Sequence, residues 1–360
     1  MLVLRIAHTA DVHLGRAFSY LGEAAQRHQE RLKRAFRRVF AEAQAQGCQL
    51  VLIAGDLFDS PRVGRHWVEF ALSTIAESRL PVIVIPGNHD PAERHPFREV
   101  SLPSNLHFVL QTTRLPLSDL DLEVVACPAG DEARWQTALR RDSGGAPLQI
   151  AVMHGSMPSA GGQGTIRPEW VRTCMLDYVA LGDWHSPQDW TQGHTVCYYS
   201  GAPEMIMPRQ QLPAVMLVVE LVAKQLAQVA KVPIGETHYP EGAINGALDW
   251  DISPYDGVQS LLSDLRALLT PETVVSLRLT GRWQAKEPLN LQVLEENLQP
   301  SCLWLELESA YQPEPLPPET PFERLLMELT RTRAEREPDR ASFYHEAAQT
   351  ALYLLRGGRL

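Results

Sequence analysis

Residues 50–59 read LVLIAGDLFD, an apolar run that ends in a glycine and two aspartates. A run of this length is typical of a buried strand, and the residues after it are typical of a loop. The same arrangement occurs upstream, where LVLRIAH (2–8) precedes Asp11 and His13, and downstream in VIVIPGNHD (82–90). Helical patterns separate these strands, so the alternation predicts an α/β fold with a mostly parallel sheet. In such sheets functional residues gather at the carboxyl ends of the strands.

Two later strands end in motifs of the same kind. A strand at 149–153 is followed by His154-Gly155, and a strand at 178–181 by Gly182-Asp183-Trp184-His185. Each of the five motifs contains a carboxylate, amide or imidazole group that can bind a divalent cation. Phosphodiesters resist attack by an anion because they are already charged, and two neighbouring cations overcome this repulsion. The five motifs in series therefore predict a two-metal centre that hydrolyses phosphate esters.

The motifs supply a set of ligands for each metal. Asp56 suits the position between the two ions, because it is central among the motifs and follows a glycine that permits close approach. The side chains expected around the first ion are those of Asp11, His13 and His185, and those around the second are Asn88, His154 and Asp183. His89 is expected to stay off the metals and to protonate the leaving alkoxide.

Asp59 and Asp90 are alternatives for orienting the ring of His89. Asp59 precedes Ser60-Pro61 and can equally be the first residue of a turn. Taken singly, the other motifs also have ordinary interpretations as turns, helix caps or structural histidines. The metal interpretation depends on all five occurring together and in order.

The chain divides into a catalytic part and a smaller C-terminal part. Residues 1–230 also predict helices at 28–46 and 67–78, strands at 123–127, 196–200 and 215–221, and a mobile glycine-rich loop at 156–164. Residues 231–310 predict a small α+β module with strands at 247–252, 274–280 and 303–308 and helices at 257–269 and 289–298. A proline-rich linker (311–321) leads to two amphipathic helices in 322–360, which separate at Pro338.

Composition limits the cellular setting more than it limits the substrate. The net charge is −10, but residues 1–230 hold 21 Lys+Arg against 23 Asp+Glu, whereas residues 231–360 hold 12 against 20. Bound cations would offset several of the acids in the first part, so charge does not exclude nucleic acid. The five scattered cysteines lack CxxC spacing, which indicates a reducing cytosol. No apolar run approaches the ~20 residues that span a bilayer, and the first motif leaves no room for a signal peptide. We therefore expect a cytoplasmic protein without a membrane segment.

Taken together, the motifs resemble those of the calcineurin-like metallophosphoesterases, and within them the SbcD-type DNA repair nucleases. The similarity covers roughly residues 1–310 and rests on TADVHLG, AGDLFDS, VIVIPGNHD and YYSGAPE (198–204). It implies a layered α-β-β-α sandwich with an α+β capping domain, and a C-terminal helical tail that grips an SbcC-type coiled-coil ATPase. It also implies a metal site at Asp11, His13, Asp56, Asn88, His154 and His185, with His89 as the catalytic histidine. One departure is that the usual Gly-His-x-His motif reads Gly182-Asp183-Trp184-His185 here.

These observations together lead to one hypothesis with two rivals. The hypothesis is a Mn²⁺-dependent DNA exonuclease or endonuclease that acts in double-strand-break repair, as a homodimer with an ATPase. The first rival is a phosphodiesterase for small nucleotides or other phosphoesters. The second is a scaffold in which Asp183 has impaired the site and the chain only docks the ATPase. The arginines of the first helix, among them Arg31, Arg34 and Arg38, are expected on a solvated outer face.

Overall fold

The computed structural model describes residues 3–158, 164–285, 289–313 and 317–356. Parts of the predicted glycine-rich loop (159–163) and of the proline-rich linker (314–316) lie outside the described residues. The chain forms two compact units, Met1–Tyr239 and Pro240–Leu360. Among the helices that the structure describes, none has the length and apolar composition needed to cross a lipid bilayer.

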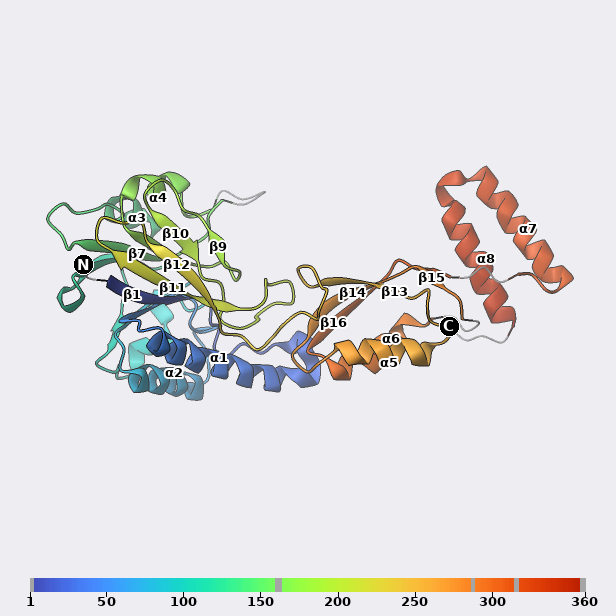
Figure 1. Cartoon of the computed structure of the whole chain (residues 1–360), viewed down its shortest axis with the longest axis horizontal. Helices are drawn as coiled ribbons and strands as arrows, with labels where there is room; N and C mark the ends of the chain where they lie inside the picture. The colour runs from blue at the N-terminus through green and yellow to red at the C-terminus, as the bar shows by residue number, and fades with distance from the viewer. Residues whose placement is uncertain (1–2, 159–163, 286–288, 314–316, 357–360) are drawn as a thin grey trace. The chain divides into compact units, whose positions relative to one another are not determined.

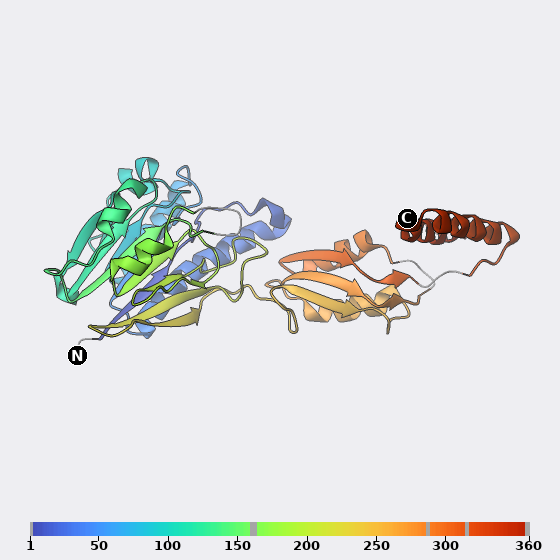
Figure 2. The ribbon, with the colours of Figure 1, turned by 90° about the horizontal axis from the view of Figure 1, so that it is seen from above.

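The first unit contains two six-stranded sheets (Figures 1 and 2). The first sheet has the order β12-β11-β1-β2-β3-β4, in which β1 to β4 are parallel and β11 runs antiparallel to β1. Its strands are β1 (Val3–Thr9), β2 (Leu50–Ala54), β3 (Val82–Ile85), β4 (Leu106–Phe108), β11 (Val215–Val222) and β12 (Gln228–Pro233). Helices α1 (Ala25–Ala45) and α2 (Arg65–Ser78) cover its outer face (Figure 1).

The second sheet has the order β5-β6-β7-β8-β10-β9 and a parallel centre. Its strands are β5 (Thr113–Leu117), β6 (Leu122–Cys127), β7 (Leu148–His154), β8 (Tyr178–Gly182), β9 (Gln188–Asp189) and β10 (Val196–Tyr199). Two short helices, α3 (Glu132–Ala138) and α4 (Pro168–Cys174), contribute to its outer layer.

Side chains alternate along the strands of the second sheet and so build two cores. Ile150 and Val152 of β7 belong to the core shared with the first sheet, which includes Ile6 and Leu52. Ala151 and Met153, the intervening residues, belong to a second core with Trp135 of α3 and Val171 of α4. Because a strand places successive side chains on opposite faces, β7 is buried on both sides. The resulting layers are helix, sheet, sheet and helix, as the family resemblance implies.

The second unit begins with a three-stranded parallel sheet, β13-β14-β16, whose core includes residues of two helices. The elements are β13 (Ala247–Asp251), α5 (Val258–Leu268), β14 (Val274–Thr280), α6 (Leu291–Leu298) and β16 (Trp304–Ser309), with a small ladder of β15 (Arg282–Trp283) and β17 (Gln312–Pro313). Two further helices, α7 (Pro321–Arg336) and α8 (Ala341–Leu355), pack against each other. The side chain of Thr320 caps α7 and that of Glu323 bonds back to it.

The elements predicted from the long apolar runs are confirmed, with small shifts such as the start of α1 at Ala25. The strands β4, β5, β9, β15 and β17 and the helices α3 and α4 are not among those predicted. One further expectation is wrong, because Arg31 of α1 is buried instead of solvated. The boundary between the compact units falls at Tyr239/Pro240. The finer division into residues 231–310, 311–321 and 322–360 stays a prediction.

Candidate metal centre

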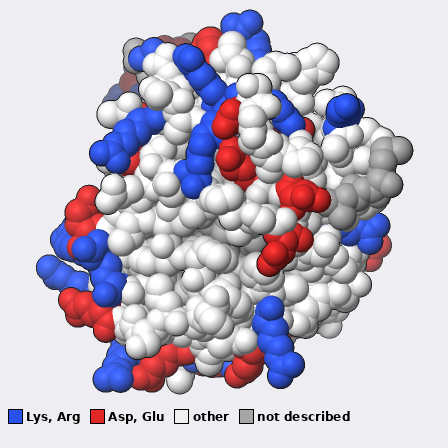
Figure 3. Space-filling model, turned by 90° about the vertical axis from the view of Figure 1, so that its left-hand side faces the viewer, with Lys and Arg blue, Asp and Glu red and all other residues white. Residues whose placement is uncertain are grey.

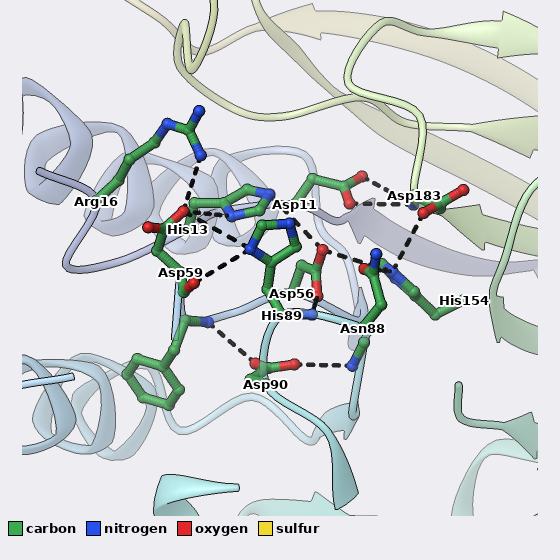
Figure 4. Close-up of polar contacts among 12 residues, drawn as sticks. Asp11, His13, Arg16, Asp56, Asp59, Asn88, His89, Asp90, His154 and Asp183 are labelled. Atoms are coloured by element: carbon green, nitrogen blue, oxygen red, sulfur yellow. Dashed lines mark hydrogen bonds and ion pairs between the residues drawn. The ribbon is translucent and has the colours of Figure 1, made fainter. Parts of the chain in front are cut away.

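The loops that follow five strands of the two sheets meet at one site (Figure 4). The first sheet contributes the loops after β1, β2 and β3, and the second contributes the end of β7 and the loop after β8. Backbone hydrogen bonds join the first two loops, from Asp11 N to the Gly55 carbonyl at 3.1 Å and from His13 N to the Asp56 carbonyl at 3.0 Å. The strand topology thus brings together residues as distant in sequence as Asp11 and Asp183, which are 172 positions apart.

Several candidate ligands have left-handed backbone conformations. The φ angles are 53° at Asp11, 51° at His13, 51° at Asp56 and 106° at Asp183. A residue other than glycine in this region carries a conformational cost of ~1–3 kcal/mol. Such strain collects at functional sites, where surrounding contacts hold the backbone in place. Four strained residues in one cluster therefore mark it as a functional site.

Two motif glycines are required by the close approach of ligand side chains. A Cβ atom on Gly87 would lie 2.1 Å from Oδ1 of Asp56, and one on Gly55 would lie 2.1 Å from Nδ1 of His154. Any side chain at either position would displace a candidate ligand. The glycines of the second and third motifs thus admit Asp56 and His154.

Asp11, His13 and His185 form one group whose ligand atoms all lie within 4.8 Å of one another. The Nδ1–H of His13 donates to Oδ1 of Asp59 at 3.0 Å, which leaves Nε2 with its lone pair. This Nε2 atom is buried and has no hydrogen-bond partner among the described residues. Burial, together with the charges of His13 and Arg16, lowers the pKa of His185 to about 3, so its ring is neutral. Two imidazole nitrogens beside a carboxylate fit a divalent cation.

Asp11 also belongs to a second group with Asp56 and His154. The Nδ1–H of His154 donates to the Ala54 carbonyl at 2.8 Å. Its Nε2 lies 3.0 Å from Oδ1 of Asn88, 3.5 Å from Oδ2 of Asp56 and 3.8 Å from Oδ1 of Asp183. The side chains of Asn88, Asp56 and Asp183 thus converge on Nε2 of His154.

The charge state of the second group indicates the place of a cation. Burial alone would lower the pKa of His154, but Asp56 and Asp11 outweigh it and raise this pKa to about 8. Burial, with Asp56 and Asp183 nearby, raises the pKa of Asp11 well above its usual range. Without an ion, the cluster therefore gathers protons to offset its carboxylates. A divalent cation would supply that positive charge, so the donor set fits the metals predicted from the sequence.

Asp183 takes part in the cluster through both its backbone and its side chain. Its N–H donates to the carboxylate of Asp11, with distances of 3.0 Å to Oδ1 and 3.2 Å to Oδ2. Its carboxylate is the group 3.8 Å from His154 Nε2. The departure from the usual motif therefore places a carboxylate within the second group.

Asp59, and not Asp90, contacts the ring of His89. The Nδ1–H of His89 donates to the carbonyl of Asp59 at 3.1 Å, and the Asp59 carboxylate is 4.0 Å away. Asp90 is fully buried and accepts from Phe58 N at 3.0 Å and Gly87 N at 2.8 Å. It also lies 3.2 Å from Nε2 of His95. Asp90 thus fastens the second and third loops together.

Two polar contacts of the site carry no signal in the sequence. Arg16 donates to Oδ1 of Asp59 at 2.8 Å, and His95 pairs with Asp90 beneath the loops. Burial works against ionisation of Asp59, but the hydrogen bonds from His13 and Arg16 outweigh it and lower its pKa. Neither Arg16 nor His95 belongs to a motif, so only the tertiary structure identifies them.

Comparisons with known proteins agree with this geometry. Residues 4–187 match the family model described as Calcineurin-like phosphoesterase. The uncharacterized metallophosphoesterase YhaO of Bacillus subtilis is 27% identical over 221 residues, 55% of this chain and 52% of that protein. One component of the nuclease SbcCD of Rhodobacter capsulatus is 28% identical over 259 residues, 56% of this chain and 62% of that protein. The DNA double-strand break repair protein Mre11 of Halobacterium salinarum is 24% identical over 304 residues, 80% of this chain and 73% of that protein. The chain thus covers less than two thirds of the first two relatives.

Proposed function

This chain belongs to the calcineurin-like phosphoesterase family, hydrolases that act on ester bonds, and on that premise we propose that it is a Mn²⁺-dependent DNA nuclease. The proposal covers exonuclease or endonuclease cleavage of phosphodiester bonds during double-strand-break repair. It also covers a homodimeric state and an SbcC-type ATPase partner. Support comes from the metal cluster, from the relatives named for a nuclease and for DNA break repair, and from the exposed apolar side chains of α7 and α8.

The position of Asp56 is the observation on which the proposal mainly depends. Its Oδ2 atom lies 3.7 Å from Nε2 of His13 and 3.5 Å from Nε2 of His154. One carboxylate oxygen therefore stands between the two groups of ligands, as a bridging ligand must. In this assignment Asp11, His13 and His185 would hold one ion, Asn88, His154 and Asp183 would hold the other, and Asp56 would serve both.

Two bound cations would neutralise the charge of the phosphate and activate a water molecule for attack on phosphorus. His89 supplies the proton that the leaving alkoxide needs. The ring of His89 acts as the acid when both of its nitrogens carry a proton, with Nδ1–H donating to the Asp59 carbonyl and Nε2–H available to the leaving group. Its side chain is 41% exposed, so substrate can reach it. When the phosphorus–oxygen bond to the leaving group breaks, that oxygen takes the proton from Nε2.

The backbone of His89 is fixed independently of its side chain. Its backbone N–H donates to Oδ1 of Asp56 at 2.8 Å. This hydrogen bond fixes the position of the His89 backbone relative to the proposed bridging ligand. Asp59 accepts the ring's Nδ1–H through its carbonyl and contacts His13 through its carboxylate. Asp59 thus positions both the proton donor and one ligand.

One face of the molecule carries no charge pattern that favours DNA as substrate. On the face drawn in Figure 3, basic and acidic side chains are intermixed around a broad uncharged area. That face therefore offers no continuous basic track along which a DNA backbone could lie. The preference for DNA over small nucleotides rests on the nuclease and DNA-repair relatives and on the YYSGAPE segment.

An ATPase partner is proposed from the apolar surface of the C-terminal helices. Phe322, Leu325 and Leu329 of α7 are all exposed and recur at helical spacing. Phe343 and Leu354 of α8 are exposed as well. A coiled-coil segment offers a complementary apolar stripe for such a surface. The cytosolic location is supported by the five cysteines, which are buried and form no disulfide.

A hydrolysis assay with Mn²⁺ tests the proposal. Linear duplex DNA, single-stranded DNA and cyclic nucleotides are offered to the wild type and to His89→Ala. We expect cleavage of DNA by the wild type, and a loss of ~10²–10⁴-fold in His89→Ala with unchanged bound metal. Cleavage restricted to cyclic nucleotides would favour the small-substrate rival. Absence of both hydrolysis and bound metal would favour the scaffold.

A further inference from the structure

A second cluster of buried polar side chains lies away from the proposed ligands, between α1 and the loop at 200–211. His28, Arg31, Glu204 and Gln210 are all buried. Placing a carboxylate in the interior is costly unless hydrogen bonds compensate for the lost water. Neither the arginine-rich helix nor the YYSGAPE segment has a place in the chemistry described so far.

Glu204 and Gln210 fix the backbone of the loop. The Glu204 carboxylate accepts from Met205 N at 2.7 Å and from Glu236 N at 2.8 Å. The Gln210 amide donates to the Glu204 carbonyl at 3.1 Å and accepts from Ile206 N at 3.0 Å. Two side chains thus hold several backbone groups that would otherwise be buried without partners.

Helix α1 holds the same loop and the segment beside it. The Nε2–H of His28 donates to the Met205 carbonyl at 2.6 Å. Arg34 donates twice to Glu236, at 2.6 Å each, and Arg38 donates to the Ile234 carbonyl at 3.1 Å. The arginine face of α1 therefore packs on the chain instead of facing water alone.

The other side of the loop touches the backbone of a proposed metal ligand. Ala202 N donates to the His185 carbonyl at 3.1 Å, and Gln211 N donates to Oγ of Ser186 at 3.0 Å. Gly201 has a φ of 72°, and a Cβ atom there would lie 2.8 Å from the same His185 carbonyl. The 200–211 loop thus contacts both α1 and residues His185 and Ser186.

We propose that Glu204 and His28 are positioning residues for His185, holding the 200–211 loop so that this imidazole stays beside Asp11 and His13. The inference rests on the proposed metal function and adds residues that contact neither metal nor substrate. Side chains that orient a metal ligand typically change metal affinity by ~10–100-fold when removed. Glu204→Gln exchanges one acceptor for a donor opposite a backbone N–H, and His28→Gln shortens the reach to the Met205 carbonyl.

Mn²⁺ titration of the metal-free full chain tests this, by calorimetry and by electron paramagnetic resonance. In Glu204→Gln and His28→Gln we expect one of the two ions to bind ~10–100-fold more weakly, with the other unchanged. Gln149→Ala is the matched control, because Gln149 is a buried side chain that holds the Asp142 backbone at the opposite end of β7. It should lower thermal stability without changing Mn²⁺ affinity.

A double variant separates positioning from general destabilisation. If Glu204 acts through His185, then Glu204→Gln adds nothing to the loss of affinity in His185→Ala. Additive losses would overturn the proposal, as would unchanged Mn²⁺ binding in both Glu204→Gln and His28→Gln. A wild type that binds no Mn²⁺ would overturn the proposed function together with this inference, whereas failure of the inference alone leaves wild-type binding intact.

Discussion

Oδ1 of Asp59 lies 3.0 Å from Nδ1 of His13 and 2.8 Å from Nη1 of Arg16. This carboxylate selects the His13 tautomer whose Nε2 is left without a proton. Arg16 keeps the carboxylate ionised and fixes its direction. The contact links Asp59 more directly to a proposed ligand than to the ring of His89.

Replacing Asp59 should therefore weaken metal binding. We expect Asp59→Ala to lower the affinity for one Mn²⁺ by ~10–100-fold, because His13 loses the group that orients it. Asp59→Asn should lose less, since its amide oxygen can still accept from Nδ1. Equilibrium dialysis with elemental analysis measures both. Intact affinity with a reduced kcat in Asp59→Ala would instead assign Asp59 to His89 alone.

The substitution Asp183→Asn tests the carboxylate that replaces the usual histidine. An amide binds a cation more weakly than a carboxylate does, so this variant should lose one ion and most of its activity. Asn tolerates a positive φ, so the backbone N–H to the Asp11 carboxylate is kept. Asp183→His should keep both ions. Tight binding of two Mn²⁺ by Asp183→Asn would show that this side chain is not a ligand.

Asp183 should also shift metal preference. A carboxylate in place of an imidazole favours oxygen-preferring ions, so the wild type should select Mn²⁺ or Mg²⁺ over Zn²⁺ more strongly than Asp183→His does. The added negative charge also makes a bound water less acidic, which moves the activity optimum to higher pH. Competition titrations and pH–rate profiles of the two proteins measure these differences.

Removing the chain from Thr320 onward should abolish partner binding but not hydrolysis. Among the described residues, the core of the preceding module includes none beyond Tyr311, and α7 and α8 bury Ala334, Ala348 and Leu352. We expect a small phosphodiester to be hydrolysed at the wild-type rate by the truncated chain, which should no longer bind the ATPase. In the full chain, Leu329→Asp should likewise abolish ATPase binding and leave hydrolysis unchanged. Glu328→Ala should change neither. Loss of hydrolysis on truncation would place the helices in the fold of the catalytic unit.

His8 should make stability depend on pH. It is buried on β1, its Nδ1 lies 2.8 Å from the Tyr178 hydroxyl, and burial lowers its pKa from 6.5 to about 3. Below pH ~6.5 the imidazole of His8 binds a proton in the unfolded chain but not in the folded chain. The free energy of unfolding therefore has its full value above pH ~6.5 and decreases as the pH falls toward about 3. The loss is ~1.4 kcal/mol per pH unit.

Urea unfolding of the wild type and of His8→Gln measures this term. Between about pH 7 and about pH 5 the stability advantage of the wild type over the variant should shrink by ~2 kcal/mol. The comparison is independent of what the substitution costs at neutral pH. A difference that stays constant across this range would mean that the pKa of His8 is not lowered by folding.

Local patterns in the sequence are sufficient to predict the central strands and the polar residues that the structure brings together at their ends. The runs that become β1, β2, β3, β7 and β8 are apolar along most of their length and end in polar motifs, so both signals are read within a few residues. By contrast, β5 has the sequence TRLPL, in which a proline interrupts the pattern of an edge strand. Helix α3 is seven residues long and buries little beyond Trp135.

Contacts between distant residues were beyond the reach of these patterns. His28 bonds to the Met205 carbonyl across 177 residues, and nothing near either residue indicates the pairing. The role of Asp90 is a similar case, because the motif places it beside His89 in sequence while its carboxylate bonds to Phe58 N and Gly87 N. Adjacency along the chain predicted its neighbourhood but not the direction of its side chain.

The carbonyl of Ala54 joins the two sheets at the centre of the site. It ends β2 of the first sheet, accepts from His154 of the second at 2.8 Å, and would lie 1.8 Å from a Cβ atom on Gly182. The two sheets are therefore in direct contact at this point. Their spacing sets the separation of the two ligand groups. The metal affinity should therefore depend on how tightly the core between the two sheets is packed. A buried mutation far from any ligand can push the sheets apart by a few tenths of an ångström. We expect such a change to lower the metal affinity even when it is too small to lower the melting temperature.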